Sequence, residues 1–260
     1  MQIVDCEQGT EEWHLARAGV ITASNFQMIR KKVGMLTEQQ QKYVDLLMAG
    51  NPESVAMEQA GYKNKPSTQK IQDALRGKPI GDFSDAAKNY AFRCAVERIS
   101  GEPLSVQFQT PAMLRGVEME EEARLEHEKA IDTIVDLAGF VKSDDGLFGA
   151  SADSLIGEDG GAEYKCLVDP DRIRTVLLED DVDEFLPQIQ GCMWITGRKW
   201  WHYVLYCPAL KSVNKHLYVH KVERDDVYIA QMERDLLEFE ALVRDYYNQL
   251  TEGKKNEQGN

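Results

Sequence analysis

The chain has 260 residues, which is enough for one large domain, or a domain with an insert, around a full apolar core. Its net charge of −14 argues against a surface coated with cations for non-specific nucleic-acid binding, although basic groups can still line an inner channel. No apolar run approaches the length of a membrane span, and the N-terminus carries no signal segment, so we expect a cytosolic protein. The five cysteines are scattered, without a Cys-x-x-Cys pair, and are expected to be reduced.

The N-terminal segment combines two helix starts with an arginine. A helix is predicted over residues 10–18, with Thr10 as its N-cap, and a turn leads from Gly19 into a second helix that Ser24 or Thr22 can cap. A helix N-terminus with free N–H groups, a hydroxyl and a nearby Arg17 can hold a phosphate. On local grounds alone, an ordinary capped helix with a surface arginine is the favoured interpretation.

Residues 37–80 predict a small helical module. Thr37 begins a capping box, and apolar stripes and turn residues predict three short helices, over residues 41–49, 51–60 and 67–75. Five lysines and arginines make residues 63–78 locally basic. The helix order and Ala60-Gly61-Tyr62 resemble the helix-turn-helix segment of phage terminase small subunits. Contact with DNA is therefore one hypothesis for the module, and a lid or a packing insert is the other.

The remaining chain predicts a mixture of helices and strands. Helices are expected over 82–100, 110–129, 171–197 with a break at Pro187, and 224–250; strands over 131–142, 146–156, 162–168, 200–206 and 216–222; and a frayed tail over 252–260. On the helix over 110–129, Glu120 shares a face with Met113 and Val117, where an apolar side chain is expected. That face either looks into a site or is exposed at the helix end.

Residues 147–167 predict a hairpin with a Gly-rich turn, and it carries the main chemical signal. Glu163 and Lys165 share one face of the second strand because side chains alternate with period two, and Asp153 lies on the hairpin partner. Two carboxylates plus a peptide carbonyl suit a hard cation such as Mg²⁺. A lysine beside them can hold a metal-bound water or offset charge on a phosphate. Taken alone, these residues favour the alternative of a surface hairpin with an ordinary Glu–Lys pair.

The order of helices and strands is that of the PD-(D/E)xK nuclease core, a mixed central β-sheet flanked by helices with metal ligands on the central hairpin. Five motifs in order resemble the bacteriophage lambda exonuclease group, the YqaJ-like viral recombinases. They are Trp13-His-x-x-Arg17 through Ser24, Gly116-x-x-x-Glu120-x-x-Ala-Arg124, Ser151-x-Asp153 with Glu163-x-Lys165-Cys166, Gln188-x-Gln190-x-x-Met-Trp194, and the strand 200–208. We therefore predict an α/β restriction-endonuclease-like fold, as one nuclease domain over 1–260 with a helical insert at 37–80 and a flexible tail over 252–260.

The resemblance implies a Mg²⁺-dependent exonuclease, for which Mn²⁺ can substitute, that digests one strand of duplex DNA from its 5′ end. The products are 5′-mononucleotides and a 3′ single-stranded overhang for phage-type recombination. It also implies a homotrimeric ring that threads DNA, a single-strand annealing protein as partner, and a place in the bacterial host cytoplasm. A ring is compatible with the net charge, because only the channel must be basic.

By the same resemblance, Asp153 and Glu163 bind Mg²⁺ together with the backbone carbonyl of Tyr164. Lys165 positions or activates the attacking water, and Glu120 binds a second metal or its waters. Phosphodiester hydrolysis needs in-line attack and charge neutralisation, which bound metal and a lysine supply.

Gln188 is implied to orient the nucleophile or the lysine. Arg17, Ser24 and Ser151 are implied to hold the 5′-phosphate, which explains both polarity and processivity. Two departures from the family pattern stand out: Ala152 replaces the proline for which the core is named, and residues 35–90 do not match. The alternatives are another nuclease of the same core, either an endonuclease or one of different polarity, and a non-catalytic DNA-binding or packaging protein.

Overall fold

The computed structural model describes residues 1–104 and 111–252, without the side chains of residues 111–114, 116 and 117. The chain forms two compact units. The first contains Met1–Arg30 together with the chain from Asn89 onward, and the second contains Lys31–Lys88. Thr110, the predicted start of a helix, and most of the predicted tail lie outside the described residues.

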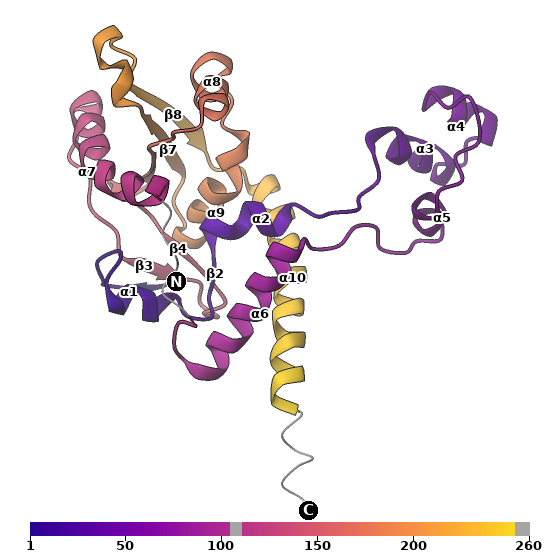
Figure 1. Cartoon of the computed structure of the whole chain (residues 1–260), viewed down its shortest axis with the longest axis horizontal. Coiled ribbons are helices and arrows are strands. Elements are labelled where there is room, and N and C mark those ends of the chain that lie inside the picture. Colours follow the sequence, from indigo (N-terminus) through magenta and orange to yellow (C-terminus); the bar gives the residue numbers. More distant parts are fainter. Residues whose placement is uncertain (105–110, 253–260) are drawn as a thin grey trace, which may run out of the picture. The chain divides into compact units, whose positions relative to one another are not determined.

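The first unit contains two mixed four-stranded sheets (Figure 1). One has the order β1-β3-β4-β2, with β1 (Gln2–Val4), β2 (Ile21–Thr22), β3 (Phe140–Lys142) and β4 (Phe148–Ser151). The other has the order β5-β6-β7-β8, with β5 (Ser154–Ile156), β6 (Gly160–Lys165), β7 (Trp200–Tyr206) and β8 (Leu217–Glu223). The pairs β2–β4 and β6–β7 are parallel and the others antiparallel. The mixed α/β class is confirmed, although two sheets stand where one was predicted.

The break between the sheets explains this difference. The sequence predicts one strand over 146–156, but β4 ends at Ser151 and β5 begins at Ser154 in the other sheet. Gln8 donates a hydrogen bond from Nε2 to the carbonyl of Ala152 at 2.9 Å, so a side chain replaces a strand partner there. The chain therefore changes sheets across Ala152 and Asp153.

The helices of this unit surround the sheets. They are α1 (Glu11–Arg17), α2 (Phe26–Arg30), α6 (Asp85–Ser100), α7 (Pro111–Ile131), α8 (Pro170–Glu179), α9 (Leu186–Thr196) and α10 (Asp226–Glu252), with short 3₁₀ turns at Ala23–Asn25, Asp183–Phe185 and Pro208–Val213. The predicted strand over 131–142 is wrong for most of its length, because α7 continues to Ile131 and only β3 is extended. In the part of the chain that the structure describes, no helix has the length and apolar character needed to cross a membrane.

Helix α9 lies at the centre of the core. It buries residues all around its surface, among them Ile189, Cys192 and Met193, as expected of a helix that is apolar on every side. At Gly191 an added Cβ would come within 2.6 Å of the Phe26 ring, so glycine allows α2 and α9 to approach closely. This packing fixes the helix that carries Gln188.

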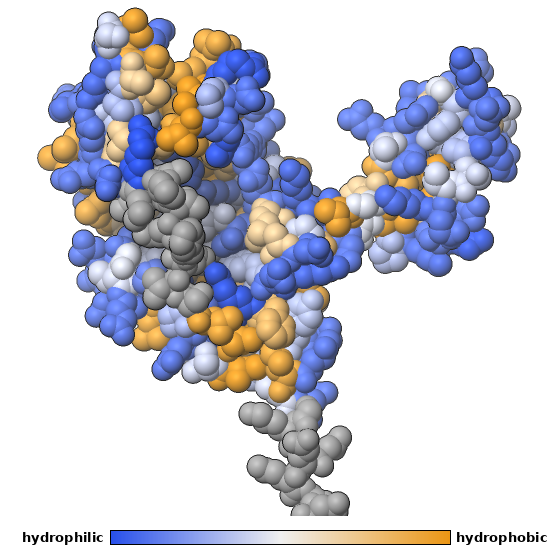
Figure 2. All heavy atoms as spheres, viewed as in Figure 1, coloured by the Kyte–Doolittle hydropathy of each residue, from blue (hydrophilic) through white to orange (hydrophobic). Residues whose placement is uncertain are grey.

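The second unit contains three helices, α3 (Glu38–Met48), α4 (Glu53–Gln59) and α5 (Gln69–Leu75). Each predicted helix is present within a few residues, and the capping box of Thr37 and Gln40 is formed. Their buried residues make a cluster of their own: Tyr43, Val44, Ala56, Ala60 and Ile71. Figure 2 shows hydrophilic side chains over most of the visible face of this unit.

Candidate active site

The hairpin of β5 and β6 opens at its end, and this opening makes room for a site. Strand β6 pairs with β7 along Gly160–Lys165, but with β5 only along Gly160–Ala162. Beyond Ala162 there is no partner residue in β5, because the residues that precede β5 in the chain belong to β4 in the other sheet. There the backbone N–H of Tyr164 has no partner in β5 and donates a hydrogen bond to Asp153 Oδ2 at 2.7 Å instead. The predicted pair of carboxylates therefore meets where the two sheets separate.

Glu163 is the buried centre of this site, with an exposed fraction of 3%. Its Oε1 accepts two short hydrogen bonds, from Lys165 Nζ at 2.6 Å and from Gln188 Nε2 at 2.6 Å. Its Oε2 is buried and has no hydrogen-bond partner among the residues that the structure describes. A buried carboxylate oxygen without a partner is costly, so this oxygen suits an electropositive ligand.

Lys165 is held as an ammonium group. Burial alone would lower its pKa, but the charges of Glu163 and Asp153 outweigh burial, and the pKa of Lys165 is raised. Its Nζ also donates to Gln188 Oε1 at 3.3 Å. Gln188, in the first turn of α9, thus orients both the lysine and Glu163 through its amide. The sequence predicts this neighbourhood only loosely, because it gives the helix face and not the strand that the face meets.

The carboxylates of the site repel one another. Burial raises the pKa of Asp153 well above its usual range, and the charges of Glu163 and Glu120 add to this effect. Burial also raises the pKa of Glu120, again with a contribution from Glu163. Glu120 is half-buried on α7, so its face does look into the site. Three carboxylates and one lysine leave an excess of negative charge.

The residues fit a hard divalent cation. Within the described ranges, no group of three or more His, Cys, Asp and Glu side chains is arranged as a complete metal site. A magnesium ion needs less, because it retains several waters and uses one or two carboxylates. Among the described residues, Glu163 Oε2 has no partner and the pKa of Asp153 is raised, and both features indicate that a bound cation would stabilise the site. The donors are oxygens, the ligand type that Mg²⁺ and Mn²⁺ prefer.

A second cluster lies on the other side of the Ala152 junction. Ser151 Oγ accepts hydrogen bonds from Arg17 Nη1 at 2.8 Å and from Trp13 Nε1 at 2.9 Å. The Arg17 guanidinium stacks over the Trp13 ring at 4.0 Å. Because both lone pairs of the serine oxygen are used, its own proton is free to be donated to an anion. Burial lowers the pKa of Arg17 to about 10, so its positive charge is retained at neutral pH.

Ser24 is the predicted residue that the structure does not bring into this cluster. Its side chain is exposed, and its Oγ lies 3.3 Å from Thr22 Oγ1, with no hydrogen bond in the described residues to Arg17 or Ser151. Sequence reasoning also gave no individual role to Trp13, which is a neighbour of Arg17 and Ser151. Trp13 contacts both Arg17 and Ser151, and its spacing of four from Arg17 on α1 was a signal that the two share a helix face.

Comparison with known proteins identifies a family. A family model of the YqaJ-like viral recombinase domain matches residues 12–199, a range that contains both clusters. No curated protein matches the chain significantly.

Solved structures share the fold. An alkaline exonuclease from Laribacter hongkongensis, LHK-Exo, superposes with a TM-score of 0.67 at 25% sequence identity, over 95% of this chain and 98% of that chain. Its complex with dAMP gives 0.66 at 24% identity over the same shares. A phage related exonuclease from Haemophilus somnus gives 0.51 at 14% identity, over 86% of this chain and 97% of that chain. The predicted restriction-endonuclease-like fold of the lambda exonuclease type is therefore confirmed.

Proposed function

The chain belongs to the YqaJ-like viral recombinase family, and on this premise we propose that it is a Mg²⁺-dependent exonuclease that resects duplex DNA from the 5′ end. Its products would be 5′-mononucleotides and a 3′ single-stranded overhang. One observation carries the proposal. The buried, unpartnered oxygen of Glu163 stands in one cluster with Lys165 and Gln188, on the strand whose Tyr164 N–H is bonded to Asp153.

Each residue of this cluster has a part in phosphodiester hydrolysis. Asp153 and Glu163 would hold the ion with the backbone carbonyl of Tyr164, and Glu120 a second ion or its waters. When bound, the metal supplies charge neutralisation at the phosphate and lowers the pKa of an attacking water. Lys165, as an ammonium, donates hydrogen bonds that orient the water and offset negative charge on the phosphate oxygens.

Gln188 has a positioning role, because it contacts both Lys165 and Glu163. The amide holds the lysine and the carboxylate together through hydrogen bonds before substrate arrives. Such preorganisation avoids reorientation during the reaction, which is a large part of electrostatic catalysis.

The polarity follows from the second cluster. Arg17 and Ser151 form a cation and a hydroxyl donor, and Ser151 is two residues from Asp153, about 7 Å along extended chain. A terminal phosphate held there would place the next phosphodiester near the metal ligands. Ser24 makes no hydrogen bond to this cluster among the described residues, so the proposed phosphate site consists of Arg17 and Ser151.

The wider setting belongs to the same proposal. We infer a homotrimeric ring around DNA, transfer of the overhang to a single-strand annealing protein, and action in the bacterial cytoplasm on phage or prophage DNA. Family membership supports these points. Sedimentation of the purified protein, with and without DNA ends, tests the ring directly.

A linear duplex labelled separately at each 5′ and 3′ end tests the activity. It would carry a 5′-phosphate or a 5′-hydroxyl, with Mg²⁺ or EDTA. We expect Mg²⁺-dependent release of the 5′ label, faster from phosphorylated ends, while the 3′-labelled strand persists. Lys165→Ala should reduce the rate by at least about a hundredfold, the usual loss for a group that stabilises transition-state charge.

Other outcomes select the alternatives. Internal nicks or release of the 3′ label would indicate a different nuclease on the same fold. DNA binding that survives EDTA, without any cleavage, would indicate a non-catalytic DNA-binding or packaging protein. Lys199→Ala is the matched control, because Lys199 pairs with Asp159 on the exposed surface and touches none of the site residues.

A further inference from the structure

A small polar recess lies between α1 and α6. Its cavity measures about 50 Å³, and its lining includes Trp13, Arg17, Thr22, Arg93 and Glu97. This exceeds the roughly 10–15 Å³ that one ordered water needs, so the recess has room for water or for an oxygen of a small anion.

The recess has more positive charge than its own carboxylate can neutralise. Arg17 makes no ion pair with any described residue, and Arg93 approaches Glu97 only to 3.5 Å. Within the described part of the chain, the Nε of Arg93 is buried without a hydrogen-bond partner. Glu97 is occupied by the backbone, because its carboxylate oxygens accept from the N–H groups of Gly19 and Leu104 at 2.9 and 3.1 Å. The two guanidinium groups therefore line the recess with one carboxylate, whose oxygens already accept hydrogen bonds from the backbone.

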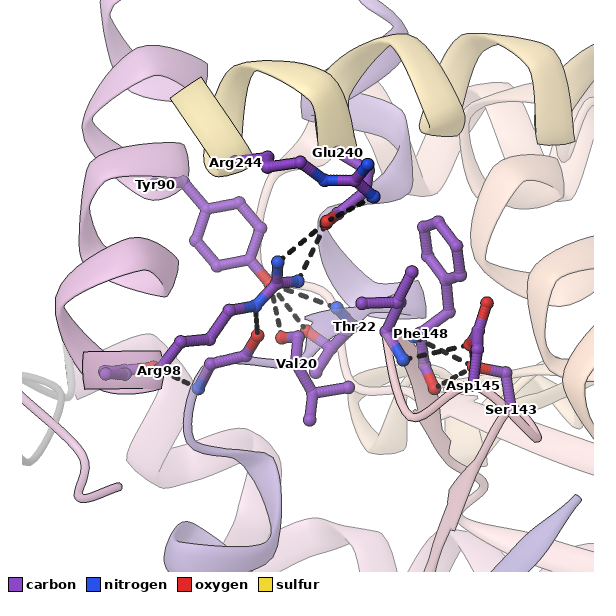
Figure 3. A network of polar contacts seen from close by, with 12 residues as sticks. Val20, Thr22, Tyr90, Arg98, Ser143, Asp145, Phe148, Glu240 and Arg244 are labelled. Atoms are coloured by element: carbon purple, nitrogen blue, oxygen red, sulfur yellow. Dashed lines mark hydrogen bonds and ion pairs between the residues drawn. The ribbon is translucent and has the colours of Figure 1, made fainter. Parts of the chain in front are cut away.

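Helix α6 holds Arg93 in a fixed position across from α1. Figure 3 shows the contacts: the Tyr90 hydroxyl accepts from the Thr22 N–H at 3.0 Å and donates to the Val20 carbonyl at 3.2 Å. Arg98 Nε donates to the Gly19 carbonyl at 2.8 Å. These bonds tie the segment after α1 to one face of α6. Arg93 lies between Tyr90 and Glu97 on that face, because residues three and four apart are neighbours on a helix.

We propose that Arg93 is a second cation for the terminal phosphate: the phosphate held at Arg17 and Ser151 would extend an oxygen into the recess, between the guanidinium groups of Arg17 and Arg93. This inference rests on the proposed end-directed nuclease activity and adds to it a residue that determines specificity for phosphorylated ends. A guanidinium suits the role, because its planar fork can donate two parallel hydrogen bonds to one phosphate. The prearranged recess would bind the anion without ordering either side chain anew.

A purely structural Arg93 is the competing explanation. Its guanidinium lies 5.1 Å from the Tyr90 ring centroid and near Glu97, so the side chain could simply brace α6. The two roles differ in one measurable respect. A brace affects phosphorylated and hydroxylated ends alike, whereas an anion ligand affects the ratio between them.

The experiment compares wild type, Arg93→Ala, Arg93→Gln and Arg93→Lys on duplexes that differ only in a 5′-phosphate or 5′-hydroxyl. Initial digestion rates are measured with Mg²⁺, and affinities for the same duplexes are measured by anisotropy in EDTA. We expect Arg93→Ala and Arg93→Gln to reduce the preference for phosphate about tenfold, the effect of one lost charge-assisted hydrogen bond. Arg93→Lys should retain part of it through its charge. Arg234→Ala, an exposed arginine on α10, should leave the ratio unchanged.

The outcomes separate this inference from the proposed function. Unchanged preference in a folded Arg93→Gln variant, which keeps most of the side-chain volume, would overturn the role of Arg93 while the exonuclease assignment stands. A wild type that binds both ends equally would overturn the recess as a phosphate site. Digestion from the 3′ end would overturn the proposed function, and the anisotropy ratio would still report on Arg93.

Discussion

At the residue scale, the site combines features that a stable fold alone would avoid. Glu163 keeps one oxygen paired twice and the other buried without a partner, while burial and like charge raise the pKa of Asp153. Ordinary cores pair their buried polar groups, so such an arrangement is typical of a site that awaits charge from a ligand. The same imbalance gives a prediction that needs no DNA.

Mg²⁺ should stabilise the folded protein by neutralising the carboxylates. At a concentration tenfold above its dissociation constant, a ligand specific for the folded state adds about 1.4 kcal/mol to the free energy of unfolding. We expect a concentration-dependent rise of the thermal midpoint with MgCl₂. Glu163→Gln, which keeps the shape but removes the charge, should abolish most of that rise.

Two comparisons isolate the site contribution. Equal ionic strength of KCl corrects for screening of the protein's net charge. Glu158→Gln, at an exposed turn residue of the same hairpin, should respond to Mg²⁺ like the wild type. An identical rise of the thermal midpoint in Glu163→Gln would show that the metal does not bind at Glu163.

Much of the site's chemistry could be predicted from sequence, because period two places Glu163 and Lys165 on one strand face and the structure joins them at 2.6 Å. The contact with Gln188 depends on how α9 packs against β4 and β7, which no local pattern determines. The Trp13–Ser151 hydrogen bond spans 138 positions of sequence, so spacing alone could not reveal it. The chemical role of each of these residues stays a prediction.

At the element scale, the α6–α10 pair supports the recess. Arg98 of α6 forms a bidentate ion pair with Glu240 of α10, with both distances 2.8 Å, and Glu240 is 3% exposed. The Tyr90 and Phe239 rings stack beside it at 5.8 Å. Figure 3 shows the Arg98–Glu240 pair beside Val20 and Thr22. The limits predicted for these two helices, 82–100 and 224–250, lie within three residues of those of α6 and α10, but the sequence could not show which long helix would pair with which.

Arg98→Ala should destabilise the protein by about 3 kcal/mol, because it leaves the Glu240 carboxylate buried without its main partner. It also removes the donor to the Gly19 carbonyl. Arg244 is the matched control, since it approaches the same Glu240 only to 3.7 Å and is 66% exposed. Arg244→Ala should change stability by less than about 1 kcal/mol. Equal effects of the two variants in urea unfolding would contradict the buried-pair interpretation.

A histidine network couples α7 to β6 and β7 and predicts acid sensitivity. His127, fully buried, has its Nδ1 3.1 Å from the Tyr164 hydroxyl and its Nε2 2.9 Å from His202 Nδ1. Burial lowers the pKa of His127 to about 4, with a further contribution from His202. The unfolded chain binds this proton near pH 6.5. The unfolded state therefore holds more protons between these values, and stability falls as the pH drops from 6.5 towards 4.

His127→Gln tests this contribution, because an amide can donate and accept in place of the two ring nitrogens without titrating. The variant should lose less stability than the wild type between pH 7 and pH 4.5 in urea unfolding. Carboxylates titrate in both proteins, so the difference between the two pH profiles is the quantity to measure. Parallel profiles would show that His127 is not the group responsible.

At the scale of the whole molecule, charge is divided unevenly along the chain. Residues 31–88 contain nine lysines and arginines and seven acidic residues, whereas the remaining chain contains 21 and 37. Composition and helix signals could predict this segment as a distinct module, because its turns and caps are local. The boundaries of the segment could not be predicted, because its two ends are joined by a backbone pairing between Val33 and Asp82, which are far apart in sequence.

That pairing allows the helical unit to be removed cleanly. Val33 and Asp82 exchange two backbone hydrogen bonds, at 2.8 and 2.9 Å, as a pair flanking a two-residue hairpin turn does. Replacing residues 34–81 by Asn-Gly should therefore close the chain without strain and leave α6 intact. We expect this variant to unfold cooperatively within a few degrees of the wild type and to retain the Mg²⁺-dependent rise of its midpoint, because the three helices bury their apolar residues in a cluster of their own. Loss of cooperative unfolding, with or without Mg²⁺, would mean that the first unit needs the three helices of the second unit for its own core.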